Sequence, residues 1–230
     1  MNEKLGKVVG VNGNMVTVEF DEHVTQNEVA FVCVGDMRLK SEVIRVRGKR
    51  ADMQVFEDTR GVRVGDRVEF TDELLAVELG PGLLTAVYDG LQNPLPELAE
   101  QSGFFLQRGL YLDALDRKKT WEFTPVAKVG DAVEAAATLG TVPEGIFTHR
   151  IMVPFSYLGN WKVTWMTDAG EYTVDTVIAK VSNGREEREV TMVQEWPVKM
   201  PIKCYAERLL PTEPLVTQQR FIDTFFPVAR

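Results

Sequence analysis

Alternation of apolar and polar residues over the first 70 positions predicts short β-strands joined by tight turns. Met15 to Phe20 alternates in this way, and Asn12-Gly13 before it marks a turn, because both residues tolerate a positive φ. Val29 to Val34 is a continuous apolar run, which is typical of a buried strand. Further strands are expected at Lys7 to Val11, Glu42 to Arg47, Asp52 to Phe56 and Arg67 to Phe70, with a hairpin loop at Gly48-Lys49-Arg50. These close turns predict a small closed β-barrel, since closure removes the free edges of a sheet.

Apolar residues take a helical spacing in the stretch that follows. Pro81 suits the first turn of a helix, because its missing N–H costs nothing there, and Gly90 and Pro94 suit its end. A second short helix is expected over Pro96 to Gln101, before Gly103. The apolar positions of the first helix, which we expect to pack in a core, are Leu83, Leu84, Val87 and Leu91.

Alternation returns at Trp121 and predicts a second compact β unit. Trp161 to Thr167 alternates, and turns are expected at Asp168-Ala169-Gly170 and Asn183-Gly184. The other strands are expected at Trp121 to Pro125, Leu139 to Val142, Ile151 to Pro154, Tyr172 to Val181 and Arg188 to Val193. This order predicts an antiparallel meander.

Proline recurs along the C-terminal stretch, and the residue before each proline is biased away from helix. This pattern predicts an extended connector rather than a packed element. The pairs that end in proline are Trp196-Pro197, Met200-Pro201, Leu210-Pro211 and Glu213-Pro214. Thr217 to Phe226 then resumes an apolar pattern, and the sequence stops soon afterwards at Arg230. Natural termini usually fray into polar residues, so we expect this end to lie inside a larger domain. We expect its apolar side chains to cause dimerisation or disorder.

Charge narrows the possible partners. The 230 residues include 34 acidic and 26 basic side chains, and the net charge of −8 disfavours general nucleic-acid binding. The basic cluster Arg45, Arg47, Lys49 and Arg50 favours a solvated strand face or a partner contact over a polyanion site. No apolar run approaches the length of a membrane helix, and the first residues do not form a secretory signal.

Residues typical of catalytic and metal sites are sparse. The two cysteines, Cys33 and Cys204, form neither a metal pattern nor a disulfide framework, which fits a reducing, cytoplasmic setting. His23 and His149 lack the clustered ligands of a zinc site, and we interpret both as structural.

Neither Gly-rich segment completes a nucleotide-binding loop. Such a loop needs Gly-x4-Gly-Lys-Ser/Thr, so that backbone N–H groups surround the phosphates. Gly48-Lys49 lacks the earlier glycine and the following hydroxyl residue, and Gly80-Pro81-Gly82 lacks the lysine. A lipoyl- or biotinyl-carrier unit is disfavoured because Val133 to Val142 contains no lysine. We therefore predict no catalytic, cofactor-binding or metal-binding residue in this chain.

Several long motifs, in order along the chain, resemble the catalytic A subunit of V-type and archaeal A-type rotary ATPases. The motifs are Glu42 to Val46, Gln54 to Thr59, Gly61 to Asp66, Val77 to Leu84, Tyr88 to Leu95, His149 to Pro154, Gln194 to Val198 and Pro214 to Ala229. The resemblance covers essentially the whole chain. It implies a mainly β fold, with an N-terminal six-stranded β-barrel, an inserted β-rich bulge domain and short helices of a truncated α/β nucleotide-binding domain.

The resemblance also implies a layout. Residues 1–72 would be the barrel, and residues 73–110 a helical connector that starts the nucleotide-binding domain. Residues 111–192 would be the inserted bulge, and residues 193–230 a connector that re-enters the truncated nucleotide-binding domain. In the family the phosphate loop follows the stretch with which this chain ends, so no catalytic residue is carried over.

The implied enzyme is the full-length subunit, which would couple ATP hydrolysis or synthesis to H⁺ or Na⁺ transport, using ATP or ADP and Mg²⁺. The 230-residue chain alone is expected to be inactive and to bind none of these cofactors. Expected partners are B subunits and other A subunits in an alternating hexameric ring, the central stalk and the peripheral stalk, with no nucleic acid and no direct membrane insertion. The expected location is cytoplasmic, in the peripheral part of a membrane-associated complex. Candidate contact residues are Arg45, Arg47, Lys49 and Arg50.

The chain departs from the family pattern at two places. Gln218 stands where the family usually has glycine, which removes positive-φ freedom there. Lysines at 199 and 203 flank Pro201, where the family favours arginines. The residues alone leave open a free-standing β-rich protein-binding or adaptor module with no enzymatic activity. A non-catalytic B subunit is disfavoured by the long insertion from Trp121 to Val193.

Overall fold

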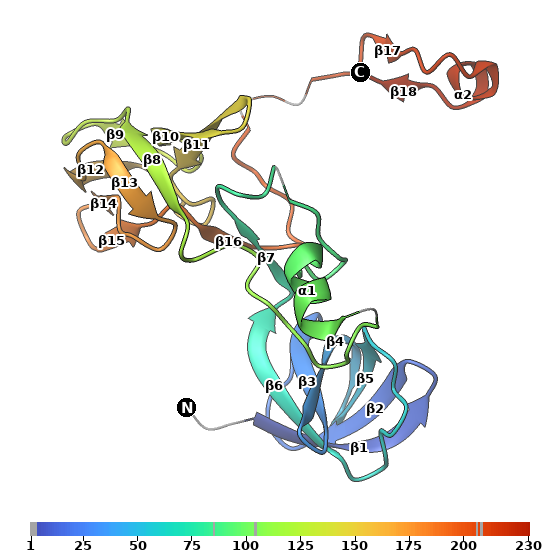
Figure 1. Ribbon diagram of the computed structural model, residues 1–230. Coiled ribbons are helices and arrows are strands. Elements are labelled where there is room, and N and C mark those ends of the chain that lie inside the picture. Colours follow the sequence, from blue (N-terminus) through green and yellow to red (C-terminus); the bar gives the residue numbers. More distant parts are fainter. Residues whose placement is uncertain (1–3, 85, 104, 206, 208) are drawn as a thin grey trace.

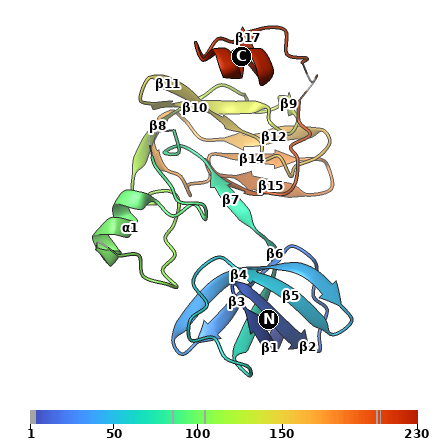
Figure 2. The same ribbon diagram turned by 90° about the vertical axis from the view of Figure 1, so that its right-hand side faces the viewer.

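The protein is described by a computed structural model that covers residues 4–84, 86–103, 105–205, 207 and 209–230. Three parts follow one another along these residues: a closed β-barrel, a β domain and a small C-terminal module (Figure 1). In Figures 1 and 2 the barrel and the β domain lie at the two ends of a connector that contains β7 (Ala76–Leu79). The mainly β fold agrees with the sequence prediction.

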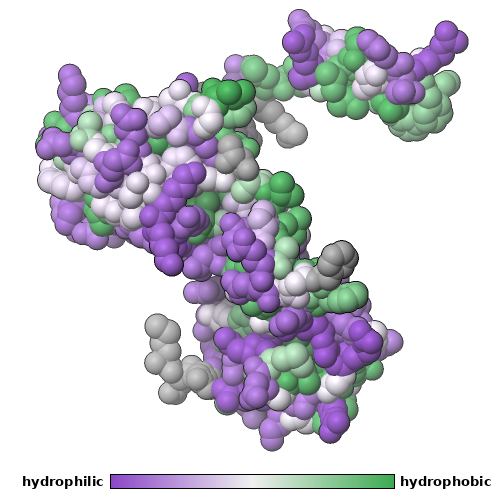
Figure 3. Space-filling model, in the orientation of Figure 1, coloured by the Kyte–Doolittle hydropathy of each residue, from purple (hydrophilic) through white to green (hydrophobic). Residues whose placement is uncertain are grey.

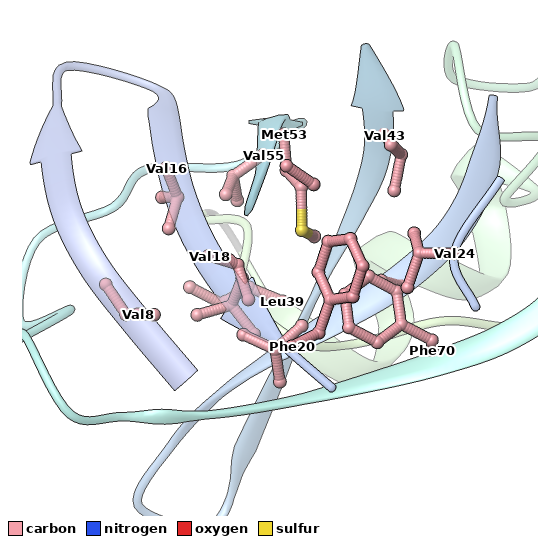
Figure 4. Packing of buried hydrophobic residues seen from close by; sticks show 14 residues of the cluster. Val8, Val16, Val18, Phe20, Val24, Leu39, Val43, Met53, Val55 and Phe70 are labelled. Carbon is pink, nitrogen blue, oxygen red and sulfur yellow. The ribbon is translucent and has the colours of Figure 1, made fainter. Parts of the chain in front are cut away.

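Six strands close the barrel around one core. They are β1 (Lys4–Asn12), β2 (Met15–Phe20), β3 (Glu28–Val34), β4 (Met37–Arg47), β5 (Arg50–Val55) and β6 (Arg67–Leu74). Every neighbouring pair is antiparallel, and β1 pairs with β6 to complete the order β1-β2-β5-β4-β3-β6. Alternate residues such as Val16, Val18 and Phe20 point inward and form the buried cluster in Figure 4. The predicted six-stranded barrel is confirmed.

Closure brings β1 close to its neighbours at Gly6. A Cβ atom there would lie 2.7 Å from Cγ1 of Val18 and 2.9 Å from Cε2 of Phe70. Phe70 also meets Phe20 edge to face, with 5.7 Å between the ring centroids. Glycine at position 6 therefore lets the aromatic end of the core close.

Two strands far apart in sequence form the connector. β7 follows the last barrel strand, and β16 (Gln194–Pro197) leaves the β domain and pairs with it antiparallel. Trp196 packs edge to face on Phe155, with 5.5 Å between the ring centroids. The expectation of an unpacked connector is therefore wrong at Trp196-Pro197. Pro197 is compatible with a strand here because it is the last residue of β16, in a sheet of only two strands.

The helix predicted to open at Pro81 does not form in the described residues 81–84 and 86–94, which run through turns and bends. Gly82 has a φ of +112° and Gln92 a φ of +65°, values that an α-helix excludes. Leu84 and Val87 are exposed, so the expectation that this apolar stripe packs in a core is wrong as well.

The second predicted helix is confirmed as α1 (Leu95–Ser102). It follows Pro94, buries Leu98, and ends at Gly103, which has a φ of +67°. No helix among the described residues is long and apolar enough to span a membrane.

The β domain contains two four-stranded sheets, β11-β10-β8-β13 and β15-β14-β12-β9. The strands are β8 (Thr120–Pro125), β9 (Ala132–Val133), β10 (Thr138–Glu144), β11 (Phe147–Met152), β12 (Trp161–Met166), β13 (Gly170–Thr173), β14 (Ala179–Ser182) and β15 (Glu187–Val190). Neighbouring strands are antiparallel, as predicted. The predicted meander is wrong, because β9 and β12 lie in the other sheet from β8, β10 and β11, and the strand expected from Tyr172 to Val181 is broken. A turn closed by the N–H of Thr176 and the carbonyl of Thr173 sends β13 and β14 into different sheets.

The C-terminal module contains β17 (Pro214–Leu215), α2 (Arg220–Phe225) and β18 (Val228–Ala229), and it stands apart from the other parts in Figures 1 and 2. The Asp223 carboxylate accepts the N–H groups of Thr217, at 3.0 Å, and Gln218, at 3.1 Å. Gln218 has a φ of +66°, which lies in the left-handed region. Glutamine therefore stands at a position whose backbone conformation favours the glycine that the family usually has there.

Candidate functional site

The histidines and cysteines do not come together. No group of three or more His, Cys, Asp or Glu side chains in the described residues could hold a metal ion. Cys33 and Cys204 are free thiols, and burial raises the pKa of Cys33. His23 is exposed, whereas His149 contacts the buried Glu144.

The two Gly-rich segments have structural roles. Gly48-Lys49 turns the chain between β4 and β5, with Gly48 at a φ of +60°. Gly82 donates its N–H to Oε1 of Glu144 at 2.7 Å. A phosphate loop instead turns its N–H groups toward a ligand at the start of a helix.

The basic cluster lies at the hairpin of β4 and β5. Arg47 pairs with Asp52 at 3.2 Å, Lys49 with Asp21 at 2.7 Å, and Arg50 with Glu19 at 3.5 Å. All four basic residues, Arg45, Arg47, Lys49 and Arg50, are exposed. Because acidic neighbours offset much of the positive charge, this geometry favours a solvated face or protein contact over a polyanion site.

Arg117 ties the connector to the β domain. It forms an ion pair with Glu78 of β7, and another with Asp175, between β13 and β14, at 2.7 Å. Burial raises the pKa of Glu78, and Arg117 opposes that shift. The side-chain amide of Gln92 both donates to and accepts from the backbone of Glu78 at 2.7 Å, as a neighbouring strand would.

The segment between α1 and β8 lies against the barrel. The N–H of Lys40 donates to the Tyr111 hydroxyl at 2.6 Å, and the N–H of Gly109 donates to the Glu57 carboxylate at 3.0 Å. Burial raises the pKa of Tyr111 and lowers the pKa of Lys40. A cleft of about 510 Å³ lies between this segment, α1 and the barrel.

Apolar side chains line a cleft beside the connector and are exposed in the C-terminal region. A cleft of about 280 Å³ between the connector and the β domain is lined by Leu79, Leu83, Leu84, Ile151, Phe155 and Ile202, among others. The C-terminal region exposes Leu209, Leu210, Phe221, Phe225 and Phe226, and apolar surface shows on the separate C-terminal segment in Figure 3. Exposed apolar side chains gathered in this way are typical of a surface that a partner or another part of a protein covers.

Sequence reasoning missed the polar residues that join these parts. Arg117 lies 39 positions from Glu78, and Glu144 lies 62 positions from Gly82. The only local signal for Glu144 is a carboxylate directly before the tight turn Gly145-Ile146, which by itself indicates an exposed hairpin end.

Comparisons with known proteins match both large parts. A family model described as the beta-barrel domain of the ATP synthase alpha/beta family matches residues 8–72. A second, described as the ATP synthase alpha/beta subunit barrel-sandwich domain, matches residues 112–199.

The V-type ATP synthase alpha chain of Treponema denticola is 61% identical over 100% of this chain and 39% of its own length. V-type ATP synthase alpha chain 1 of Treponema pallidum is 59% identical over the same shares, and the alpha chain of Borrelia hermsii is 57% identical over 99% of this chain and 40% of its own length. The chain thus spans about two fifths of the length of these relatives.

Proposed function

Because its barrel and its β domain belong to the ATP synthase alpha/beta family, we propose that this chain is the N-terminal part of the catalytic A subunit of a V-type ATP synthase. The observation that carries the proposal is 61% identity over the whole chain to a V-type ATP synthase alpha chain, with both domains matched in order. The same observation favours this function over a free-standing adaptor module.

The full-length subunit would hydrolyse or make ATP with Mg²⁺ and couple that reaction to H⁺ or Na⁺ transport. Phosphoryl transfer of this kind depends on a phosphate loop, a bound metal ion and a residue that positions water. In this proposal those groups belong to the rest of the subunit. The 230 residues of this chain would supply assembly surfaces and would have no ATPase activity alone.

The proposed layout is a barrel over residues 1–72, the start of the nucleotide-binding domain over 73–110, an inserted bulge over 111–192, and a re-entering connector over 193–230. The pairing of β7 with β16 supports an insertion, because the two strands flank the β domain and bring its ends together. The barrel would pack in an alternating ring with A and B subunits, on the cytoplasmic, peripheral side of a membrane-associated complex. The central and peripheral stalks would be further partners.

The test compares this chain with the complete A subunit, each mixed with B subunit. We expect saturable, Mg²⁺-dependent ATPase activity from the complete mixture only, and a complex of A and B subunits by light scattering. Saturable turnover by the mixture that contains the 230-residue chain would overturn the assignment of the catalytic groups to the rest of the subunit. Failure of the complete A subunit to associate with B would favour the adaptor function.

A further inference from the structure

The buried carboxylate of Glu144 joins two segments that are distant in sequence. Glu144 is the last residue of β10 and is only 1% exposed. Its Oε1 accepts the N–H of Gly82 at 2.7 Å and that of Leu84 at 3.0 Å. Its Oε2 lies 2.7 Å from Nδ1 of His149, on the neighbouring strand β11. A buried carboxylate needs such donors, and here two of the three belong to the connector loop.

The first part of that loop fits closely against the β domain. A Cβ atom on Gly80 would lie 2.9 Å from Cδ1 of Leu115 and 3.0 Å from the carbonyl oxygen of Met192. Beyond this point the packing is lost, because Leu84 and Val87 are exposed. The hydrogen bonds to Glu144 thus anchor the loop where it passes from packed to exposed.

The same residues form a wall of the apolar cleft of about 280 Å³. Leu83, Leu84 and His149 all line it, together with residues of the connector and of β11. Movement of the loop away from the β10–β11 hairpin would therefore change the width of the cleft.

We propose that Glu144 is a latch, which fixes the connector loop Gly80–Leu84 to the β10–β11 hairpin and keeps this wall of the apolar cleft in place. When the carboxylate is removed, the loop opens while both sheets of the β domain stay folded. The inference does not depend on the proposed function, since it concerns only contacts within the described residues.

Amide hydrogen exchange of the Glu144→Ala variant tests the latch in the whole 230-residue chain. We expect the Gly82 and Leu84 amides to exchange at least about tenfold faster, while amides of β10 and β14 change by less than about twofold. Glu134→Gln, an exposed carboxylate of the same domain, is the matched control and should change neither set. Protected Gly82 and Leu84 amides in Glu144→Ala would overturn the proposal. An equal rise across the β domain would also overturn it, because Glu144 would then be a general support of the fold.

The conservative variant Glu144→Gln resolves the case in which Glu144→Ala fails to fold. Glutamine keeps one side-chain oxygen for the Gly82 and Leu84 N–H groups but presents an NH₂ group to His149. We expect intermediate exchange at these two amides and loss of the His149 Nδ1–H signal in the proton NMR spectrum. Unchanged exchange together with an unchanged His149 signal would exclude the latch.

Discussion

The barrel and the β domain bury similar kinds of residue in different ways. The barrel is one sheet that closes on itself, and its buried residues form one cluster. The β domain is built from two open sheets, and its buried residues form two clusters, against both of which the half-buried Met166 packs. Each part also buries a carboxylate that accepts backbone N–H groups, Glu28 in the barrel and Glu144 in the β domain.

This difference explains how each part relates to the connector. Closure pairs both edges of all six barrel strands within the barrel itself. The β domain has end strands in both sheets, and it is joined to the connector through Arg117 and Glu144. We therefore expect the barrel to unfold as an independent unit, and the β domain to be sensitive to changes at the connector.

The largest expected effect comes from one added methyl group, which should destabilise one of the two parts and leave the other folded. In Gly140→Ala, the new Cβ would lie 2.2 Å from the ring of Phe123 and 2.8 Å from the carbonyl oxygen of Thr124, so it should destabilise the β domain by about 3 kcal/mol or more. Gly6→Ala should destabilise the barrel instead, by about 2–3 kcal/mol. Hydrogen exchange read separately over β8 and β2 measures both effects.

Gly10→Ala is the control for these two variants. Its new Cβ would have no neighbour closer than 3.8 Å, so we expect a change within about 0.5 kcal/mol. If either destabilising variant increased hydrogen exchange equally in both parts, the two would unfold as one unit. That result would contradict independent unfolding of the barrel.

The buried carboxylate of the barrel gives the next effect. Glu28 is fully buried, and it accepts the N–H of Thr25 at 3.0 Å and the N–H of Asp72 at 2.9 Å. Glu28→Ala leaves both donors without this partner, so we expect the free energy of unfolding of the barrel in urea to fall by about 2 kcal/mol. The exposed neighbour Glu73→Ala should change the free energy of unfolding by less than about 0.5 kcal/mol. Equal effects of the two substitutions would contradict the role given to burial.

A smaller, pH-dependent effect is expected where the barrel meets the segment before β8. Burial raises the pKa of Tyr111 above its unfolded value near 10, so its contribution to stability is complete below about pH 10 and is lost as pH rises through the folded value. Tyr111→Phe should cost about 1 kcal/mol at pH 8, because the N–H of Lys40 loses its acceptor. Urea unfolding should show that the free energies of unfolding of Tyr111→Phe and of the unsubstituted chain come closer as the pH rises from 8 to 11. A constant difference over that range would show that folding does not raise the pKa of Tyr111.

The sequence predicts the strands well because their signal is local. Alternation at Val16, Val18 and Phe20 is enough to define an inward face, and Gly103 is enough to end α1. The leucines after Pro81 have helical spacing, but Gly82 and Gln92 adopt positive φ values there, and tertiary contacts override the period.

The polar contacts could not be predicted in the same way. Glu78, Arg117 and Asp175 meet only after the connector and the β domain have formed. Glu144 looks like the exposed end of a hairpin in the sequence, and the fold buries it beneath a loop 60 or more residues earlier. Long-range placement of this kind leaves no local pattern.

The smallest expected effect concerns the basic cluster of the barrel. The side chains of Lys49 and Asp21 are 72% and 90% exposed, so water and salt screen their ion pair, although Asp21 raises the pKa of Lys49. Lys49→Ala should leave the thermal midpoint of the isolated chain unchanged within error, in contrast to Glu28→Ala in the same barrel. If the hairpin of β4 and β5 contacts a neighbouring subunit, the same substitution should weaken binding of the complete A subunit to B, with a stronger effect at low salt. A lower thermal midpoint of the isolated chain would mean that the ion pair between Lys49 and Asp21 stabilises the barrel. It would contradict the view that only the interior stabilises the barrel while this surface serves assembly.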